Sequence, residues 1–370
     1  MEEIQLKDIC DLDNGYAFKS EDYVEKSGTL NCRMSNIRPD GTFDILYSAK
    51  YLPDEFADKY EEYILHDGDL IIAMTDMAGD PKILGVPTVV NTQGYTLLLN
   101  QRVGRLRFIK NGVNADYLKL ALQCPKVRNY LKKFAGGGVQ LNVSKKDILS
   151  TPVQMRNEKE QTYIADIFKS VFEIKAKMEH ELQLLDELIK ARFVEMFDGK
   201  YPEDKLLNLC NIIDYRGKTP EKVEGGLPFI TAKNVKMHHM TLEPREYISK
   251  ETYDKVMIRG FPKQGDVVFT TEAPLGNVCR IPHFDTEFYI GQRIVTMQTD
   301  ALNPAYLEYA LSDEEFVRKY MGKSSGSTVT GIRVRLLEQL TIPVPPRPLQ
   351  DEFSIFVNQV NKSKFVEEQL

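Results

Sequence analysis

The sequence predicts an α+β fold in which two similar mixed α/β domains, related by pseudo-two-fold symmetry, are joined by long antiparallel coiled-coil helices. Three observations support this prediction. Short motifs recur in the same order in both halves of the chain, residues 159–197 contain neither proline nor glycine, and a strand–proline–helix junction occurs twice. Together they indicate two copies of one domain, each followed by a helix.

The repeat is visible in collinear motifs. Gly68-Asp-Leu-Ile-Ile72 matches Gly265-Asp-Val-Val-Phe269, and Asn100-Gln-Arg-Val103 matches Gly291-Gln-Arg-Ile294. Further matches join residues 6–10 with 206–210, 34–38 with 232–236, 114–122 with 303–311, and 152–153 with 343–344. The offsets lie between 200 at the first match and 189–191 at the later ones, which indicates a duplicated domain because a solenoid unit is much shorter.

Each copy is expected to mix strands and helices. Apolar runs bounded by Gly, Asp or Asn are typical of strands, and they occur at residues 69–74, 96–99, 266–271 and 294–297. Residues 116–134 and 304–321 carry Tyr, Leu and Ala at spacings of three and four, which predicts one helix in each copy. A loop rich in glycine and hydroxyl side chains follows each helix, at 135–140 and 323–331.

The stretch 159–197 predicts one long helix, which ends before Gly199. Counting in sevens from Ile164 and from Phe168 finds eight apolar residues in ten positions, the pattern of a coiled-coil seam. The residues expected on this seam and on its partner helix are Ile164, Phe168, Val171, Met178, Leu182, Leu185, Ile189, Phe353, Phe356 and Val360. The partner helix, 349–370, ends at the counterpart of Leu182 in the repeat, so 185–197 is expected to lack an intrachain partner and to be open to self-association.

These elements divide the chain into a first domain at 1–155, a central spacer helix at 156–199, a second domain at 200–346 and a short C-terminal spacer helix at 347–370. A chain of 370 residues also favours two domains over one core.

The composition favours a soluble protein of the cytoplasm. The five cysteines are scattered, without the close pairs of a zinc site or a disulfide framework, and they suit a reducing compartment. The N-terminus is acidic and lacks the apolar run of a signal peptide. No window approaches the roughly 18–20 apolar residues that a membrane span needs, so no membrane partner is expected.

The net charge of −6 by itself argues mildly against nucleic acid, but the charge is sorted along the chain. Residues 101–146 contain eleven Lys and Arg and one acid, and 316–335 contain five basic residues and no acid. A local basic face matters to a polyanion because screening limits the reach of charge to about 8–10 Å. The alternative interpretation is a solvated helix face.

The chain resembles the specificity subunit of type I restriction–modification enzymes over essentially its full length. The resemblance rests on Asn14-Gly-Tyr-Ala-Phe-Lys-Ser20, the two Gly-Asp strands, the Gly/Ser/Thr loops and the Pro-Val junctions that lead through Gln161 and Gln350 into helices. It implies two target-recognition domains that each read one half of a split double-stranded DNA target, with helices that set the gap between the halves.

The resemblance also implies that this chain is not an enzyme and binds no cofactor or metal itself. Modification (methyltransferase) subunits would dock on the helices and methylate adenine with S-adenosylmethionine. A restriction/translocase subunit would use ATP and Mg to cut DNA.

Polar and basic side chains on loops and strand ends are the candidate DNA-binding residues, because they suit base edges and phosphates. They are Ser35, Asn36 and Arg38 with Lys233, Asn234 and Lys236; Gln140, Asn142 and Ser144 with Ser325, Ser327, Thr328, Thr330, Arg333 and Arg335; and Arg216 with Lys218. The alternatives are that the asparagines cap turns and that the loops are plain flexible hairpins. Gln101-Arg102 and Gln292-Arg293 are interpreted as structural, bridging carboxylates within each domain.

Catalytic motifs are missing from the sequence. It has no Asp-Pro-Pro-Tyr-like methylation motif, no Gly-x-Gly-x-x-Gly turn and no P-loop, and His238-His239 are interpreted as surface residues. Two other functions stay open: a two-headed coiled-coil scaffold that binds proteins without DNA, and an enzyme whose site is assembled from both copies.

Overall fold

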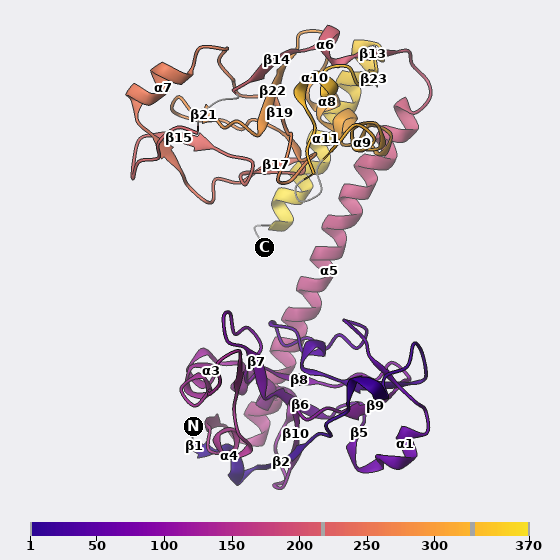
Figure 1. Cartoon of the computed structure of the whole chain (residues 1–370), viewed down its shortest axis with the longest axis vertical. Helices are drawn as coiled ribbons and strands as arrows, with labels where there is room; N and C mark the ends of the chain where they lie inside the picture. The colour runs from indigo at the N-terminus through magenta and orange to yellow at the C-terminus, as the bar shows by residue number, and fades with distance from the viewer. Residues whose placement is uncertain (1, 216–218, 326–329, 369–370) are drawn as a thin grey trace. The chain divides into compact units, whose positions relative to one another are not determined.

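The computed structural model describes residues 2–215, 219–325 and 330–368 and divides the chain into two compact units. Unit 1 is Met1–Lys175 and unit 2 is Ala176–Leu370. Each unit combines small sheets with a helical layer (Figure 1). The helix α5 (Glu158–Phe197) begins in unit 1 and ends in unit 2.

Unit 1 is built on two four-stranded sheets. The first has the order β2 (Cys10–Asn14), β10 (Val103–Phe108), β6 (Leu70–Ala73), β8 (Pro87–Val89), and all its pairs are antiparallel. The second has the order β4 (Tyr51–Leu52), β3 (Thr29–Cys32), β9 (Thr96–Leu99), β5 (Ile64–Leu65), with β3 and β9 parallel.

The strand β6 lies between two cores, which explains its continuous apolar run. Leu70 and Ile72 belong to a core with the helices α2 (Ala115–Gln123) and α3 (Pro125–Lys132). Ile71 and Ala73 belong to a core with β3 and β9. Because successive strand residues point to opposite faces, a strand covered on both faces is apolar at every position.

Unit 2 repeats this construction. Its first sheet has the order β14 (Asn211–Asp214), β22 (Ile294–Gln298), β19 (Val267–Thr270), β20 (Val278–Arg280), the same order as in unit 1. Its second sheet contains β18 (Tyr247–Ile248), β15 (Leu227–Ile230) and β21 (Tyr289–Ile290), with β15 and β21 parallel like β3 and β9. The prediction of a duplicated α+β fold is therefore confirmed.

The prediction of one helix per copy between the strands and the loop is wrong, because each is two helices. In unit 1 the break is at Cys124, and Pro125 occupies the first turn of α3, where its missing N–H costs nothing. In unit 2, α8 (Pro304–Ser312) stops before Asp313, whose side chain caps α9 (Glu314–Met321) by accepting from the Glu315 N–H at 3.0 Å.

The repeated junction attaches each unit to a helix through a buried glutamine. Gln161 Oε1 accepts from the Asn114 N–H at 2.9 Å, and its Nε2 donates to the Arg156 carbonyl at 2.8 Å. Gln350 on α11 (Arg347–Glu368) repeats the arrangement, accepting from Asn303 at 2.8 Å and donating to Pro345 at 2.7 Å. Because both amides are buried and hydrogen-bonded at both ends, they hold the first turn of each helix against its unit.

Within unit 2, α11 runs antiparallel to the end of α5. Arg192 pairs with Glu352 at 3.0 Å, and Asp186 pairs with Lys364, so residue numbers rise on one helix as they fall on the other. Ile189, Phe193 and Phe197 share one core with α11.

The prediction that 185–197 lacks an intrachain partner is therefore wrong, because antiparallel pairing places the start of α11 beside the end of α5. The predicted seam residues Leu185, Ile189, Phe353, Phe356 and Val360 pack in this core.

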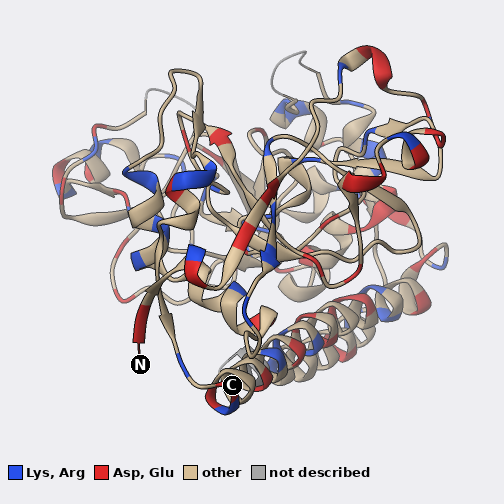
Figure 2. Cartoon of the chain, turned by 90° about the horizontal axis from the view of Figure 1, so that it is seen from below, with Lys and Arg blue, Asp and Glu red and all other residues tan. Residues whose placement is uncertain are grey.

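The other predicted seam residues lie nearer the start of α5. Ile164 packs on the core of unit 1, and Met178 and Leu182 are half-buried. Phe168 and Val171 are 45% and 53% exposed, which contradicts their predicted place on a covered seam. Charged residues of both signs alternate along the rest of α5 (Figure 2).

Candidate nucleic-acid interface

The two asparagines predicted to contact DNA are interior residues in the structure. Asn36 accepts from the Arg33 N–H at 2.8 Å and donates to the Asp44 carbonyl at 2.9 Å. Asn234 accepts from the Thr231 N–H at 2.9 Å and donates to two carbonyls at 3.1 Å. Both are at most 3% exposed, and exposing a satisfied buried amide is costly. The prediction of DNA contact is corrected for these two residues, which close turns at equivalent positions.

Their neighbours in sequence differ in accessibility. The Ser35 hydroxyl is buried and has no hydrogen-bond partner within the described structure. The Arg38 guanidinium lies over the ring of Tyr47, 3.7 Å from its centroid. Lys233 and Lys236 are exposed, and they are the members of this group that remain open to a polyanion.

The two glycine- and hydroxyl-rich loops occupy equivalent places, which backbone hydrogen bonds define. In unit 1, the Met74 N–H donates to the Arg102 carbonyl at 3.0 Å, and the Val143 N–H donates to the Met74 carbonyl at 2.9 Å. In unit 2, Thr271 donates to Arg293 at 2.9 Å, and Ile332 donates to Thr271 at 2.9 Å. Each loop therefore lies beside the arginine of a Gln-Arg motif.

Each loop is also closed on itself by a pair of hydrogen bonds. Gly136 and Asn142 exchange N–H···O bonds of 3.2 and 2.9 Å in unit 1. Ser325 and Gly331 exchange bonds of 3.0 and 3.1 Å in unit 2.

The predicted loop residues differ in their surroundings. In unit 1, Gln140 and Asn142 lie on β11 (Gln140–Asn142), which pairs with β7 (Thr75–Met77). Ser144 instead caps the helix α4 (Lys145–Leu149) by accepting from the Asp147 N–H, so its hydroxyl has a structural role. In unit 2, Thr330, Arg333 and Arg335 are exposed. The predicted residues Arg216, Lys218, Ser327 and Thr328 lie outside the described residues.

A polar hollow of about 400 Å³ in unit 2 brings several of these residues together. It is lined by Thr271, Glu272, Gln292, Arg293, Ser325, Gly331, Ile332 and Arg333. A second hollow of about 220 Å³ shares Gln292 and Arg293 and adds Thr219, Lys222 and Lys233 among its lining residues. Ser325 and Arg333 therefore line the larger hollow and Lys233 lines the smaller one, while Gln292 and Arg293 line both.

The Gln-Arg motif and Glu272 are the functional candidates that sequence reasoning missed. Arg293 does bridge a carboxylate as predicted, because its Nε lies 2.7 Å from Glu272 Oε1. Both side chains are nevertheless about half exposed, at 52% and 42%, and both line the larger hollow. The recurrence of Gln-Arg in both copies beside a polar loop was the available signal.

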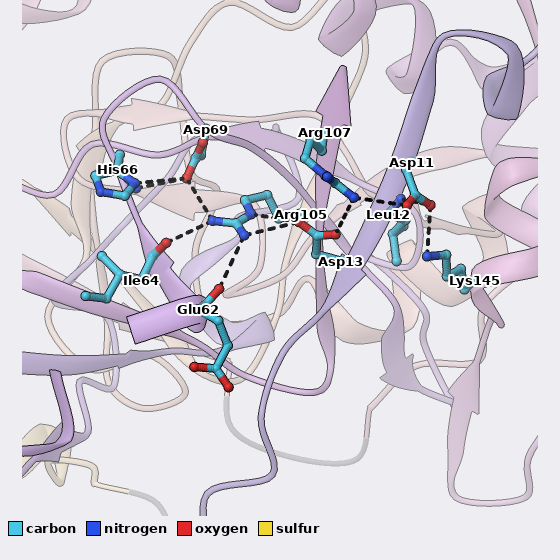
Figure 3. A network of polar contacts seen from close by, with 10 residues as sticks. All are labelled: Asp11, Leu12, Asp13, Glu62, Ile64, His66, Asp69, Arg105, Arg107 and Lys145. Carbon is cyan, nitrogen blue, oxygen red and sulfur yellow. Dashed lines mark hydrogen bonds and ion pairs between the residues drawn. The ribbon is translucent and has the colours of Figure 1, made fainter. Parts of the chain in front are cut away.

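The basic run at 101–146 is partly neutralised within unit 1. Figure 3 shows Arg105 between Asp13 and Asp69, with N···O distances of 3.1 and 3.8 Å, and Arg107 beside Asp11 at 3.2 Å. Lys145 lies 2.8 Å from Asp11, and its hydrogen bond holds the pKa of that carboxyl below its usual value. These bases belong to an ion-pair network, so the sequence run overstates the free positive charge.

His238 is wrongly interpreted as a surface residue, while His239 is exposed as expected. His238 Nδ1 lies 3.0 Å from Glu308 Oε1, and its ring stacks on Tyr309 with centroids 4.2 Å apart. Arg280 binds the other oxygen of this buried carboxylate at 2.6 Å. Among the described residues, no three His, Cys, Asp or Glu side chains gather as a metal site.

In the part of the chain that the structure covers, no helix is both long and apolar enough to cross a bilayer.

Comparisons with known proteins also find two copies of one domain in this chain. A family model described as "Type I restriction modification DNA specificity domain" matches residues 1–188 and again residues 202–369. The type I restriction enzyme MjaVIII specificity subunit of Methanocaldococcus jannaschii is 25% identical over 187 residues, a match that covers 49% of this chain and 42% of that protein.

Two solved structures share the fold over the whole chain. The S subunit of the type I restriction-modification system from M. genitalium has a TM-score of 0.58 and 11% identity, covering 100% of this chain and 91% of that chain. A chain from a study of complex assembly and conformational transition in the type I R-M system has a TM-score of 0.55 and 18% identity, covering 100% and 93%.

Proposed function

Because this chain belongs to the family of type I restriction modification DNA specificity domains, we propose that it is the DNA-reading specificity subunit of a type I restriction–modification complex. Each unit reads one half of a bipartite double-stranded target, and the helices set the gap between the halves. The observation that carries this proposal is the set of backbone hydrogen bonds that repeats in both units, called the frame below. It fixes the polar loop beside Arg102 in unit 1 and beside Arg293 in unit 2, and it presents polar side chains at equivalent places.

The residue types at the frame suit direct reading of bases. Arg and Gln side chains form bidentate hydrogen bonds with guanine and adenine in the major groove, and a carboxylate accepts from cytosine N4. The exposed Lys222, Lys233 and Arg333 around the hollows suit phosphates, which set register and orientation without specifying sequence.

We assign the chemistry to partner subunits. Methyltransferase subunits would supply S-adenosylmethionine-dependent adenine methylation, and a restriction/translocase subunit would supply ATP- and Mg-dependent cleavage. The absence of a methylation motif and of a P-loop from the sequence supports this assignment. The cytoplasm, where such a complex meets DNA, is the proposed location.

The exposed apolar side chains on α5 support docking of the modification subunits there. Ile167, Phe168, Val171, Phe172 and Ile174 are 43–59% exposed. A stripe of this size on a helix is typical of a surface that another protein covers. This stripe lies outside the segment of α5 that packs against α11.

The test is selection by the full chain from DNA duplexes that contain two randomised blocks separated by a gap of variable length. Two short enriched motifs at one preferred gap are expected, with affinity that falls steeply as salt rises. A chain that retains no duplex even at low salt would support the alternative function, a protein-binding scaffold.

A further inference from the structure

Units 1 and 2 place different side chains on one shared backbone frame. Thr75 and Glu272 are equivalent because each follows the residue whose N–H donates to the Arg102 or Arg293 carbonyl. Asn142 and Gly331 are equivalent because they pair with Thr75 and Glu272 and close their loops in the same way. The frame therefore carries Thr and Asn in unit 1 where it carries Glu and Gly in unit 2.

In each unit, the sizes of the two side chains at these paired positions are matched to each other. The Thr75 hydroxyl donates to Asn142 Oδ1 at 2.7 Å, so two small polar groups share the place in unit 1. In unit 2, a Cβ on Gly331 would lie 3.1 Å from the Glu272 Cβ and 3.1 Å from the Thr271 carbonyl. Glycine at 331 therefore leaves room for the larger Glu272 at the edge of the hollow.

The Glu272–Arg293 pair is accessible and easily separated. Its members are 42% and 52% exposed, and an ion pair in that environment contributes little to stability. Both groups line the larger hollow of unit 2. A DNA base edge can thus replace each partner at small cost.

The carboxylate distinguishes base reading from phosphate binding. Glu272 lies 2.7 Å from the Arg293 guanidinium, so a phosphate bound by Arg293 would lie close to the Glu272 carboxylate. Two negative charges at such short range repel each other. A base pair presents the opposite chemistry, since guanine offers O6 and N7 acceptors while cytosine offers an N4 donor. Arg and Glu side by side match the two bases of one pair.

Resting on the proposed function, we propose that Arg293 and Glu272 select a G·C base pair in the half-site read by unit 2, Arg293 donating to guanine and Glu272 accepting from cytosine. In unit 1 the exposed Asn142, held by the buried Thr75, takes this place and selects a different base pair. The two half-sites thus differ because one frame carries two sets of side chains.

The experiment compares the full-length chain with its Glu272→Gln and Arg293→Gln variants in selection from the same randomised duplexes. Each variant is expected to lose about 10- to 100-fold discrimination at one base pair of one half-site, the same base pair for both. Asn142→Ala, at the exposed position of the unit 1 pair, is expected to change the other half-site. Thermal unfolding of each variant verifies folding, which substitution of half-exposed side chains should preserve.

Arg347→Gln is the matched control. Arg347 also binds a carboxylate through Nε, at 2.9 Å from Asp351, and the two side chains are 49% and 48% exposed. This arginine lies on α11, outside both hollows, so its loss removes the same charge and the same kind of ion pair. Both half-sites should be unchanged in this variant.

Three outcomes would overturn the inference. If the wild type selects a bipartite target and both unit 2 variants select it unchanged, the proposed function stands and the base-reading assignment fails. If the Arg293→Gln variant binds all sequences more weakly by one common factor, Arg293 contacts a phosphate instead. If the wild type selects no sequence, the proposed function fails and this inference fails with it.

Discussion

The ring of Phe193 on α5 lies 5.5 Å from the ring of Phe353 on α11, in an edge-on arrangement with an interplanar angle of 71°. Phe353 also contacts Phe197 and Tyr309, with centroids 5.6 and 5.4 Å away. This aromatic cluster joins both helices to the body of unit 2.

Replacing Phe353 with alanine should destabilise unit 2 strongly. The side chain is fully buried, and truncation of a buried phenylalanine costs about 3–5 kcal/mol through lost transfer energy and a cavity. Denaturant unfolding would measure the loss. Ile355→Ala on the same helix is the control, because Ile355 is 61% exposed and its loss should change stability by about 0.5 kcal/mol or less. Equal effects for the two variants would contradict the packing of α11 described above.

Replacing Gln350 with alanine should loosen the attachment of α11. The change leaves the Asn303 N–H and the Pro345 carbonyl without their partner, and each unpaired buried group costs about 1–3 kcal/mol. We expect a lower free energy of unfolding and, in DNA selection, a broader preference for gap length with both half-sites retained. Gln359→Ala, at an exposed position of the same helix, should change neither measurement.

Inserting seven residues after Met178 tests the helix as a spacer. Seven residues keep the heptad phase and lengthen α5 by about 10.5 Å, at 1.5 Å per residue. Since base pairs rise about 3.4 Å each along DNA, the preferred gap should grow by about three base pairs while the bases read stay the same. An insertion that alters the half-sites and leaves the gap unchanged would show that α5 does not set the spacing.

The thiols should react unequally with a thiol reagent at neutral pH. Burial raises the pKa of Cys10, Cys32, Cys210 and Cys279 to about 12, so these groups stay protonated far above neutrality. Cys124 is exposed, and the thiolate is the reactive form. One thiol per chain should react in the native protein and five in denaturant. Cys124→Ser should remove the native reaction; rapid labelling that persists in this variant would contradict the burial of the other four.

Much of the fold was predictable because it depends on local pattern. The absence of proline and glycine from 159–197 predicted α5, and the collinear motifs predicted two copies of one sheet order. The recurring Gln161 and Gln350 predicted a repeated junction, although their burial against Asn114 and Asn303 was not visible in the sequence. Where a local signal was overlooked, as at Pro125 and Asp313, one helix was predicted in place of two.

The candidate site was predicted less well, because burial depends on residues distant in the chain. Asn36 and Asn234 are of a residue type that often contacts DNA, yet their side-chain amides donate hydrogen bonds to carbonyls of the following loops. Arg105 and Arg107 count as free bases in the sequence, yet Asp11 and Asp13 on β2 and Asp69 just before β6 neutralise them. The position of a residue in the sequence did not indicate which distant carbonyl or carboxylate it would bind.

The order of residues was enough to establish the duplication, the α+β class and the long helix, since these follow from repetition, periodicity and the absence of helix-breaking residues. Folding in three dimensions selected which polar side chains face the hollow beside Arg293, and it placed the end of α5 against α11. The physical reason is that hydrogen bonds, ion pairs and apolar contacts between distant segments determine exposure, and a side chain can bind DNA only where those contacts leave it accessible.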